Sequence, residues 1–128
     1  VSLSQNYDEG TDFDDCREKG ATPILVSLTP RNEWPNGKIE RRNGSYGKWY
    51  REVVAETGVD FLDLHNISAD FLDKKFASKS EEKSKKAASK YFKKDHTHTS
   101  LIGARMNAQS IAKGLRAIHS KLADGLKK

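Results

Sequence analysis

Three ionisable side chains, those of Asp95, His96 and His98, stand together in the stretch from Lys94 to Ser100, just ahead of a long amphipathic segment. An Asp three positions before a His, at a turn that leads into a helix, allows the carboxylate to fold back onto imidazole Nδ1. Such a contact fixes the imidazole tautomer and leaves Nε2 free to take a proton from a nucleophile. The spacing therefore predicts that Asp95 and His98 are the orienting acid and the general base of a hydrolytic triad.

Two other interpretations of these residues stay open. Asp95 and His98 are compatible with a polar turn that only caps the following helix, which begins near Thr99 or Ser100. Alternatively, His96 and His98 form a His-x-His pair that binds a metal ion, with Asp95 as a third ligand. No further ligand cluster accompanies this pair, so the sequence favours the hydrolytic interpretation and no metal is predicted.

The composition of the 128-residue chain indicates one domain that is poor in apolar residues, with 35% hydrophobic residues and a mean hydropathy of -0.80. These values are low for a self-sufficient core, so we expect a single, incomplete domain over residues 1–128. The start at Val1 rather than Met suggests that an upstream part has been removed. The lone Cys16 excludes an internal disulfide and a Cys-rich zinc site. No apolar run is long enough to span a bilayer, and no membrane partner is predicted.

Upstream of the motif, two strands and a helix are expected to form a parallel crossover unit. The run 21–30 is nearly continuously apolar, which is typical of a strand buried on both faces of a parallel sheet. Residues 46–57 have helical spacing and precede Gly58, and a second strand is expected over 59–64. Strand, helix and strand in this order predict an α/β fold.

Further helices are expected over 12–19, from Asn66 through Leu72, and from Thr99 or Ser100 onward, with 75–94 forming an exposed helix or a mobile excursion. The last helix should pack on one sheet face through an apolar stripe made of Ala104, Ala108, Ile111, Leu115, Ile118 and Leu122.

Several of these strings together resemble the SGNH (GDSL-type) hydrolases, and within them the rhamnogalacturonan acetylesterase branch. The match runs from about Arg17 to Leu115 and rests on Gly20 to Val26, Thr29-Pro30, Gly58 to Leu64 and above all Asp95 to Ser100. The resemblance implies a flavodoxin-like three-layer α/β/α fold with a parallel sheet. It also implies hydrolysis of acetyl esters on pectin-type polysaccharides without any cofactor, in a secreted or periplasmic protein.

By this resemblance Asp95 is the orienting carboxylate and His98 the general base and acid, but the rest of the family's site is absent from the sequence. The family's nucleophile lies in a Gly-Asp-Ser string, and its oxyanion donors are a Gly and an Asn in two later blocks. Ser2 and Ser4 follow no strand, and Asn6 is not in a Gly-x-Asn-Asp pattern. We therefore expect this chain to be inactive alone and to serve as the C-terminal portion of an esterase. The missing N-terminal part, or another chain, would cover the sheet edge.

Two other functions stay open for the chain as a whole. The first is a non-catalytic module of the same fold that binds a polysaccharide or a partner. The second is a basic helical protein that binds nucleic acid. The net charge of +5 and the Lys-rich run 74–94 permit the latter. That run lacks Arg and a recognisable reading helix, so we predict a solvated face and no nucleic-acid partner. It could also assist the approach to acidic pectin. Trp34 and Arg31 occupy a loop suited either to sugar stacking or to simple packing.

Overall fold

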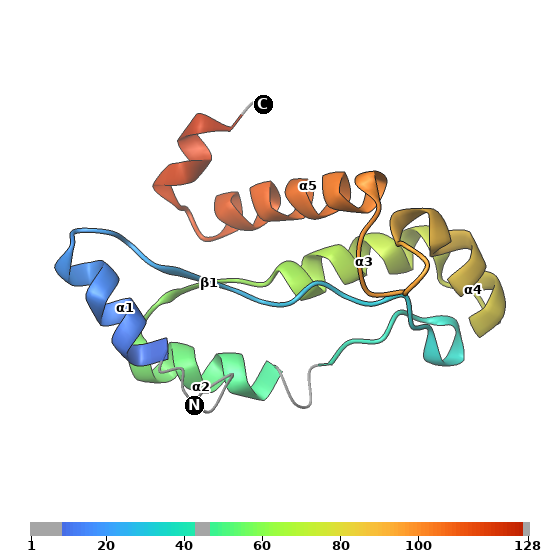
Figure 1. Ribbon diagram of the computed structural model, residues 1–128, viewed down its shortest axis with the longest axis horizontal. Coiled ribbons are helices and arrows are strands. Elements are labelled where there is room, and N and C mark those ends of the chain that lie inside the picture. The colour runs from blue at the N-terminus through green and yellow to red at the C-terminus, as the bar shows by residue number, and fades with distance from the viewer. Residues whose placement is uncertain (1–8, 43–46, 127–128) are drawn as a thin grey trace. The chain divides into compact units, whose positions relative to one another are not determined.

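The computed structural model describes residues 9–42 and 47–126 of the chain (Figure 1). The fold is mixed α/β, with a two-stranded parallel sheet and a majority of helical elements. Contacts divide the chain into two compact units. The first combines the residues up to Ser27 with residues 42–62, and the second combines residues 28–41 with those from Asp63 onward. No helix in the described part of the chain is long and apolar enough to cross a membrane.

The sheet of the first unit consists of β1 (Ile24–Val26) and β2 (Asp60–Leu62). The strands are parallel, and Leu25 is aligned with Phe61 at the centre of the register. The backbone N–H of Ser27 extends the ladder by donating to the carbonyl of Leu62 at 3.2 Å. The predicted parallel pairing is therefore confirmed, although both strands are shorter than the apolar runs that contain them.

Two helices accompany this sheet within the first unit, α1 (Glu9–Glu18) and α2 (Lys48–Thr57). Gly58 ends α2 with a φ of 65°, a left-handed conformation that glycine adopts without steric cost. The predicted helix and its stop are thus confirmed, except for Tyr46, which lies outside the described residues. The buried core of the unit comprises Phe13, Leu25, Trp49, Tyr50, Val53 and Val59.

The apolar run around β1 is not buried on both faces. Leu25 is 8% exposed, whereas Val26 is 39% exposed and Leu28 is 48% exposed. Successive side chains of a strand point to opposite faces, so Leu25 enters the core while Val26 faces away from it. The expectation of a strand covered on both faces is wrong for the chain as described.

The second unit contains α3 (Leu64–Phe76), α4 (Glu81–Ala88) and α5 (Leu101–Ala117). Short 3-10 helices occupy the connections and the C-terminal part: η1 (Pro35–Gly37), η3 (Ser89–Tyr91) and η4 (Lys121–Gly125). Trp34 is fully buried in this unit, so its ring packs in the core and is not available to stack on a sugar. The core consists of Trp34, Ile39, Ala69, Leu72, Ala88, Tyr91, Phe92 and Met106.

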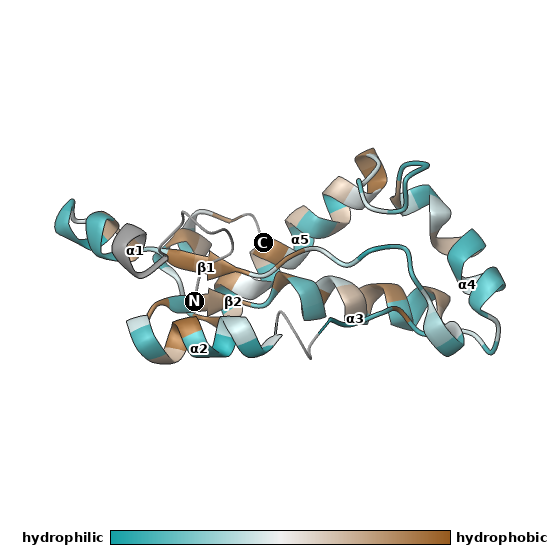
Figure 2. Cartoon of the chain, turned by 60° about the horizontal axis from the view of Figure 1, so that its bottom comes forward, coloured by the Kyte–Doolittle hydropathy of each residue, from teal (hydrophilic) through white to brown (hydrophobic). Residues whose placement is uncertain are grey.

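The middle of the Lys-rich segment before the motif forms a regular helix, α4, which Figure 2 shows as predominantly hydrophilic. Ser80 begins it by accepting a hydrogen bond from the backbone N–H of Lys83 at 3.3 Å. Two small side chains four residues apart, Ser84 and Ala88, are buried, while the lysines of α4 are exposed. The expected exposed helix is thus found for Glu81–Ala88, whereas the segment expected over 75–94 begins in the end of α3 and continues into η3.

The buried face of α5 differs from the predicted one. Its buried residues are Gly103, Met106, Ser110 and Gly114, and the helix packs against both α3 and η3. The stripe expected to be buried is exposed or half-buried, with Ile111 36% exposed. Three of the four buried residues are Gly or Ser, which add little to an apolar pattern and so leave the buried face without a periodic signal.

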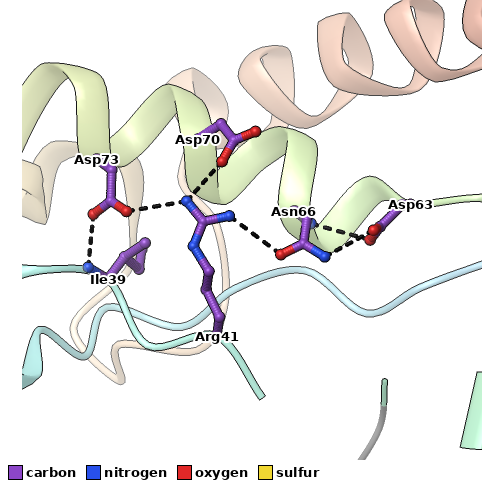
Figure 3. Close-up of polar contacts among 6 residues, drawn as sticks. All are labelled: Ile39, Arg41, Asp63, Asn66, Asp70 and Asp73. Atoms are coloured by element: carbon purple, nitrogen blue, oxygen red, sulfur yellow. Dashed lines mark hydrogen bonds and ion pairs between the residues drawn. The ribbon is translucent and has the colours of Figure 1, made fainter. Parts of the chain in front are cut away.

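Arg41 joins the segment after η1 to α3 (Figure 3). Its guanidinium Nη2 lies 3.0 Å from Asp73 Oδ2 and 2.7 Å from Asp70 Oδ1, and its Nη1 donates to Asn66 Oδ1 at 3.2 Å. Asp73 Oδ1 also accepts the backbone N–H of Ile39 at 2.8 Å. One carboxylate therefore holds both a side chain and a backbone group of the facing segment.

Asp73→Ala is expected to destabilise the chain by about 1–3 kcal/mol, because it removes a charged acceptor from Ile39 N–H and from Arg41. Asp70→Ala serves as the matched control. Its side chain is 71% exposed against 21% for Asp73, so its loss should cost about 0–1 kcal/mol. Urea unfolding followed by circular dichroism measures both values. Equal losses for the two variants would contradict the assigned role of Asp73.

Candidate active site

The loop that carries Asp95 and His98 is closed by backbone hydrogen bonds at its base. Phe92 and Thr99 form an antiparallel bridge, and Lys93 N–H donates to the carbonyl of His98 at 2.7 Å. These bonds bring the two ends of the loop side by side and limit the conformations open to the residues between them.

Ser100 joins this loop to α5 and caps the helix. Its Oγ accepts the backbone N–H of Gly103 at 3.2 Å and donates to the carbonyl of Lys90 at 2.5 Å. Asp95 and His98 do not cap the helix, because their polar contacts lie within the loop. The interpretation of Asp95 and His98 as mere helix caps is therefore wrong, and the alternative in which Ser100 is the cap is confirmed.

The Asp95 carboxylate uses its two oxygens for different purposes. Oδ1 accepts the backbone N–H groups of His98 at 2.9 Å and Thr97 at 3.2 Å, while Oδ2 contacts His98 Nδ1. The hydrogen bond from the His98 imidazole, aided by these backbone N–H groups, lowers the pKa of Asp95 from 3.8 to about 2. The backbone bonds fix the carboxylate, and the carboxylate in turn orients the imidazole.

The side chain of His98, the partner of Asp95 in this contact, is 72% exposed. Within the described residues, its Nε2 forms no hydrogen bond or ion pair. An imidazole oriented through Nδ1 and open at Nε2 can take a proton from a hydroxyl and later return it to a leaving group. The contact predicted from the Asp-x-x-His spacing is present, and its catalytic role is taken up below.

His96 turns away from His98 although only one residue separates them. Its φ of 56° lies in the left-handed region, its carbonyl accepts Asn32 N–H at 2.9 Å, and its Nε2 lies 3.6 Å from Glu33 Oε1. The two imidazoles therefore have different partners. No three His, Cys, Asp or Glu side chains gather as a metal-binding group within residues 9–42 and 47–126.

Asn32 positions this loop, a role that the sequence did not reveal. Besides its bond to the His96 carbonyl, its Nδ2 donates to the Lys85 carbonyl at 3.3 Å and its Oδ1 accepts Trp34 Nε1–H at 2.6 Å. The side chain is buried, so each of these polar groups needs its partner. An Asn two residues after Pro30 is the only local signal, and it is common to ordinary turns.

The remaining parts expected of a hydrolytic site are not provided by the described residues. Ser2, Ser4 and Asn6 lie outside them. Within the described residues, the site is thus an oriented Asp–His pair on a loop that hydrogen bonds hold in place. We identify neither an attacking hydroxyl nor oxyanion donors among these residues.

Asp95 should titrate with a pKa of about 2, and His98→Ala should raise that pKa part of the way to 3.8, because the two backbone N–H donors remain. Since the folded pKa lies below the ordinary value, the contribution of Asp95 to stability is complete above about pH 4 and is lost as the pH falls toward 2. The pKa of Asp95 is measured from the chemical shift of its carboxyl carbon, followed by NMR as a function of pH. His96→Ala is the control and should leave the titration unchanged; an unchanged midpoint in His98→Ala would contradict the pairing.

The chain is similar to proteins of one enzyme class, the rhamnogalacturonan acetylesterases. The probable rhamnogalacturonan acetylesterase YesY of Bacillus subtilis strain 168 is 31% identical over 116 residues, which cover 87% of this chain and 50% of that protein. A rhamnogalacturonan acetylesterase of Emericella nidulans is 24% identical over 98 residues, covering 77% of this chain and 37% of that protein. No protein-family model matches the chain.

This similarity supports a relationship to the SGNH hydrolases and to esterases. The chain spans half or less of the length of these two curated relatives.

Proposed function

We propose that the chain is the C-terminal portion of an SGNH-type carbohydrate acetylesterase with a flavodoxin-like three-layer α/β/α fold. Its substrate would be an acetylated rhamnogalacturonan or a related pectin-type polysaccharide. The Asp95–His98 contact is the main support for this proposal. It joins the Asp95 carboxylate to His98 Nδ1, which is the arrangement of carboxylate and imidazole that a Ser-His-Asp triad requires. The similarity to two acetylesterases supports the reaction, and the partial coverage of both supports the assignment to a portion.

In the proposed mechanism, His98 Nε2 takes the proton of a serine hydroxyl supplied by sequence upstream of Val1 while the serine oxygen attacks the acetyl carbonyl. The tetrahedral intermediate collapses, and His98 returns the proton to the departing sugar oxygen. The same imidazole then takes a proton from a water molecule, whose oxygen attacks the acetyl-serine. His98 returns that proton to the serine oxygen as the acyl–oxygen bond breaks and acetate leaves. Asp95 keeps its negative charge throughout and stabilises the imidazolium formed in each half of the reaction.

The proposal is tested by acetate release from acetylated rhamnogalacturonan, comparing the natural gene product extended upstream of Val1 with the present chain. Activity in the extended protein and none in the 128-residue chain is the expected result, because the attacking serine and its oxyanion donors supply most of the rate. An extended protein that lacks a Gly-Asp-Ser string and releases no acetate would refute the proposal. The chain would then be better described as a non-catalytic module of the same fold.

A further inference from the structure

A pocket of about 460 Å³ lies on the second unit, between α4 and the loop that carries Asp95 and His98. Asn32 and Phe92, both buried, are among its lining residues. Its lining includes four lysines and a single acidic residue, Glu82. The four lysines are Lys85 and Lys86 from α4, and Lys93 and Lys94 from the loop.

The two walls of the pocket are held together by one residue. Asn32 donates through Nδ2 to the Lys85 carbonyl at 3.3 Å and through its backbone N–H to the His96 carbonyl at 2.9 Å. Lys85 belongs to the α4 wall and His96 to the loop wall. The lysines therefore extend from two backbones at a fixed separation, which distinguishes this pocket from lysines scattered along a solvated helix.

The pocket is continuous with the candidate catalytic loop. Lys94 precedes Asp95 directly, and Lys93 N–H donates to the carbonyl of His98 at 2.7 Å. A ligand held by the loop lysines would thus be placed by the same backbone that places the imidazole. This connection argues for a part in substrate binding rather than for an unrelated site.

The chemistry of the lining favours a sugar that carries a carboxylate. Several lysines around a concave site concentrate positive potential there and attract anions. The aliphatic stems of the lysines offer apolar surface to a sugar ring. A volume of about 460 Å³ is within the range of small-ligand sites and suits one or two monosaccharide units.

We propose that this pocket is a subsite for a uronate residue of an acidic polysaccharide, with Lys85 and Lys93 as its carboxylate-binding residues. The inference rests on the proposed function, which it deepens by assigning the acidic sugar to specific residues. Under it, acetylated chains that bear carboxylates are preferred over neutral acetylated chains because the carboxylate is held beside the reacting loop.

Binding is tested first on the present chain, which requires no catalytic serine. The probe is trigalacturonate at about 0.15 M salt, where charges farther than about 8 Å are screened, and its fully methyl-esterified form is the neutral comparison. Amide shifts in the NMR spectrum should concentrate on Lys85, Lys93 and His96 for the acid, with binding of the ester weaker by about tenfold or more. The Lys85→Gln/Lys93→Gln double variant should lose a similar factor of affinity.

The matched control is Lys79→Gln/Lys83→Gln, which removes the same charge from lysines outside the pocket lining. It should keep the affinity for trigalacturonate within about twofold, because long-range charge is screened by salt. Equal losses in both double variants, equal binding of the neutral ester, or shifts centred elsewhere would overturn the proposal. Binding of single-stranded RNA at the same residues about tenfold tighter than trigalacturonate would also overturn it, in favour of a nucleic-acid site.

A second arm separates this inference from the proposed function. In the extended gene product, Lys85→Gln/Lys93→Gln should raise KM for acetylated rhamnogalacturonan about tenfold more than KM for 4-nitrophenyl acetate, since that ester carries no carboxylate. An equal loss on both substrates would overturn the subsite. If the extended protein hydrolyses neither substrate, the esterase proposal fails, and the binding measurements alone decide whether the pocket takes a uronate.

Discussion

Asp95→Asn in the gene product extended upstream of Val1 is expected to lower kcat for acetate release about 10⁴-fold, with little change in KM. The variant amide oxygen can still accept the backbone N–H groups of Thr97 and His98, which Asp95 Oδ1 accepts at 3.2 and 2.9 Å. The amide N–H would then face His98 Nδ1 and donate to it. That arrangement favours the tautomer with its proton on Nε2, which cannot accept a proton from the serine.

Thr97→Ala is the matched control for Asp95→Asn. It changes a side chain of the same loop but leaves the backbone N–H that donates to Asp95. This variant should keep kcat within about threefold of the parent. If Asp95→Asn also stayed within tenfold while its loop amide shifts were unperturbed, the carboxylate would have no orienting function in the reaction.

Gly103→Ala is expected to lower the free energy of unfolding by about 2–3 kcal/mol or more. A Cβ at this position would lie 1.9 Å from the backbone carbonyl oxygen of Tyr91, so α5 or the η3 segment must move. The same carbonyl accepts Ser100 N–H at 3.1 Å, and Ser100 Oγ caps α5. The substitution therefore strains the junction that closes the loop carrying His98.

Gly125→Ala provides the control for Gly103→Ala, because a Cβ there would meet no heavy atom within 4 Å. Urea unfolding should show a change of less than about 0.5 kcal/mol for this variant. In the Gly103 variant the Asp95 and His98 amide signals should shift as well. If Gly103→Ala left both the urea midpoint and the Asp95 and His98 amide signals unchanged, the junction between η3 and α5 would accommodate the added methyl group without strain.

Local sequence signals led to correct predictions where one or two residues decide the structure. Gly58 ends α2, Ser100 begins α5, and the three-residue spacing of Asp95 and His98 brings carboxylate and imidazole together. Each of these features depends on hydrogen bonds or φ values within a few residues, so the type and spacing of residues contain enough information.

Features that depend on distant partners were not predictable in the same way. Arg41 and Asp73 are 32 positions apart, and Asn32 reaches the carbonyl of Lys85 across 53 positions. The buried face of α5 was also missed, because Gly103 and Gly114 are buried but contribute nothing to an apolar period. The basic pocket follows from these tertiary contacts, so a run of lysines alone predicted only a solvated face.

A role for His98 as the general base of an acetylesterase is best tested by His98→Ala in the extended gene product. The measurement is acetate release from acetylated rhamnogalacturonan, together with labelling of the upstream serine by a fluorophosphonate. Both rates should fall by about 10⁴-fold or more, because the serine hydroxyl loses the group that takes its proton. Acetate release at the parent rate from a folded His98→Ala protein would show that His98 is not the general base.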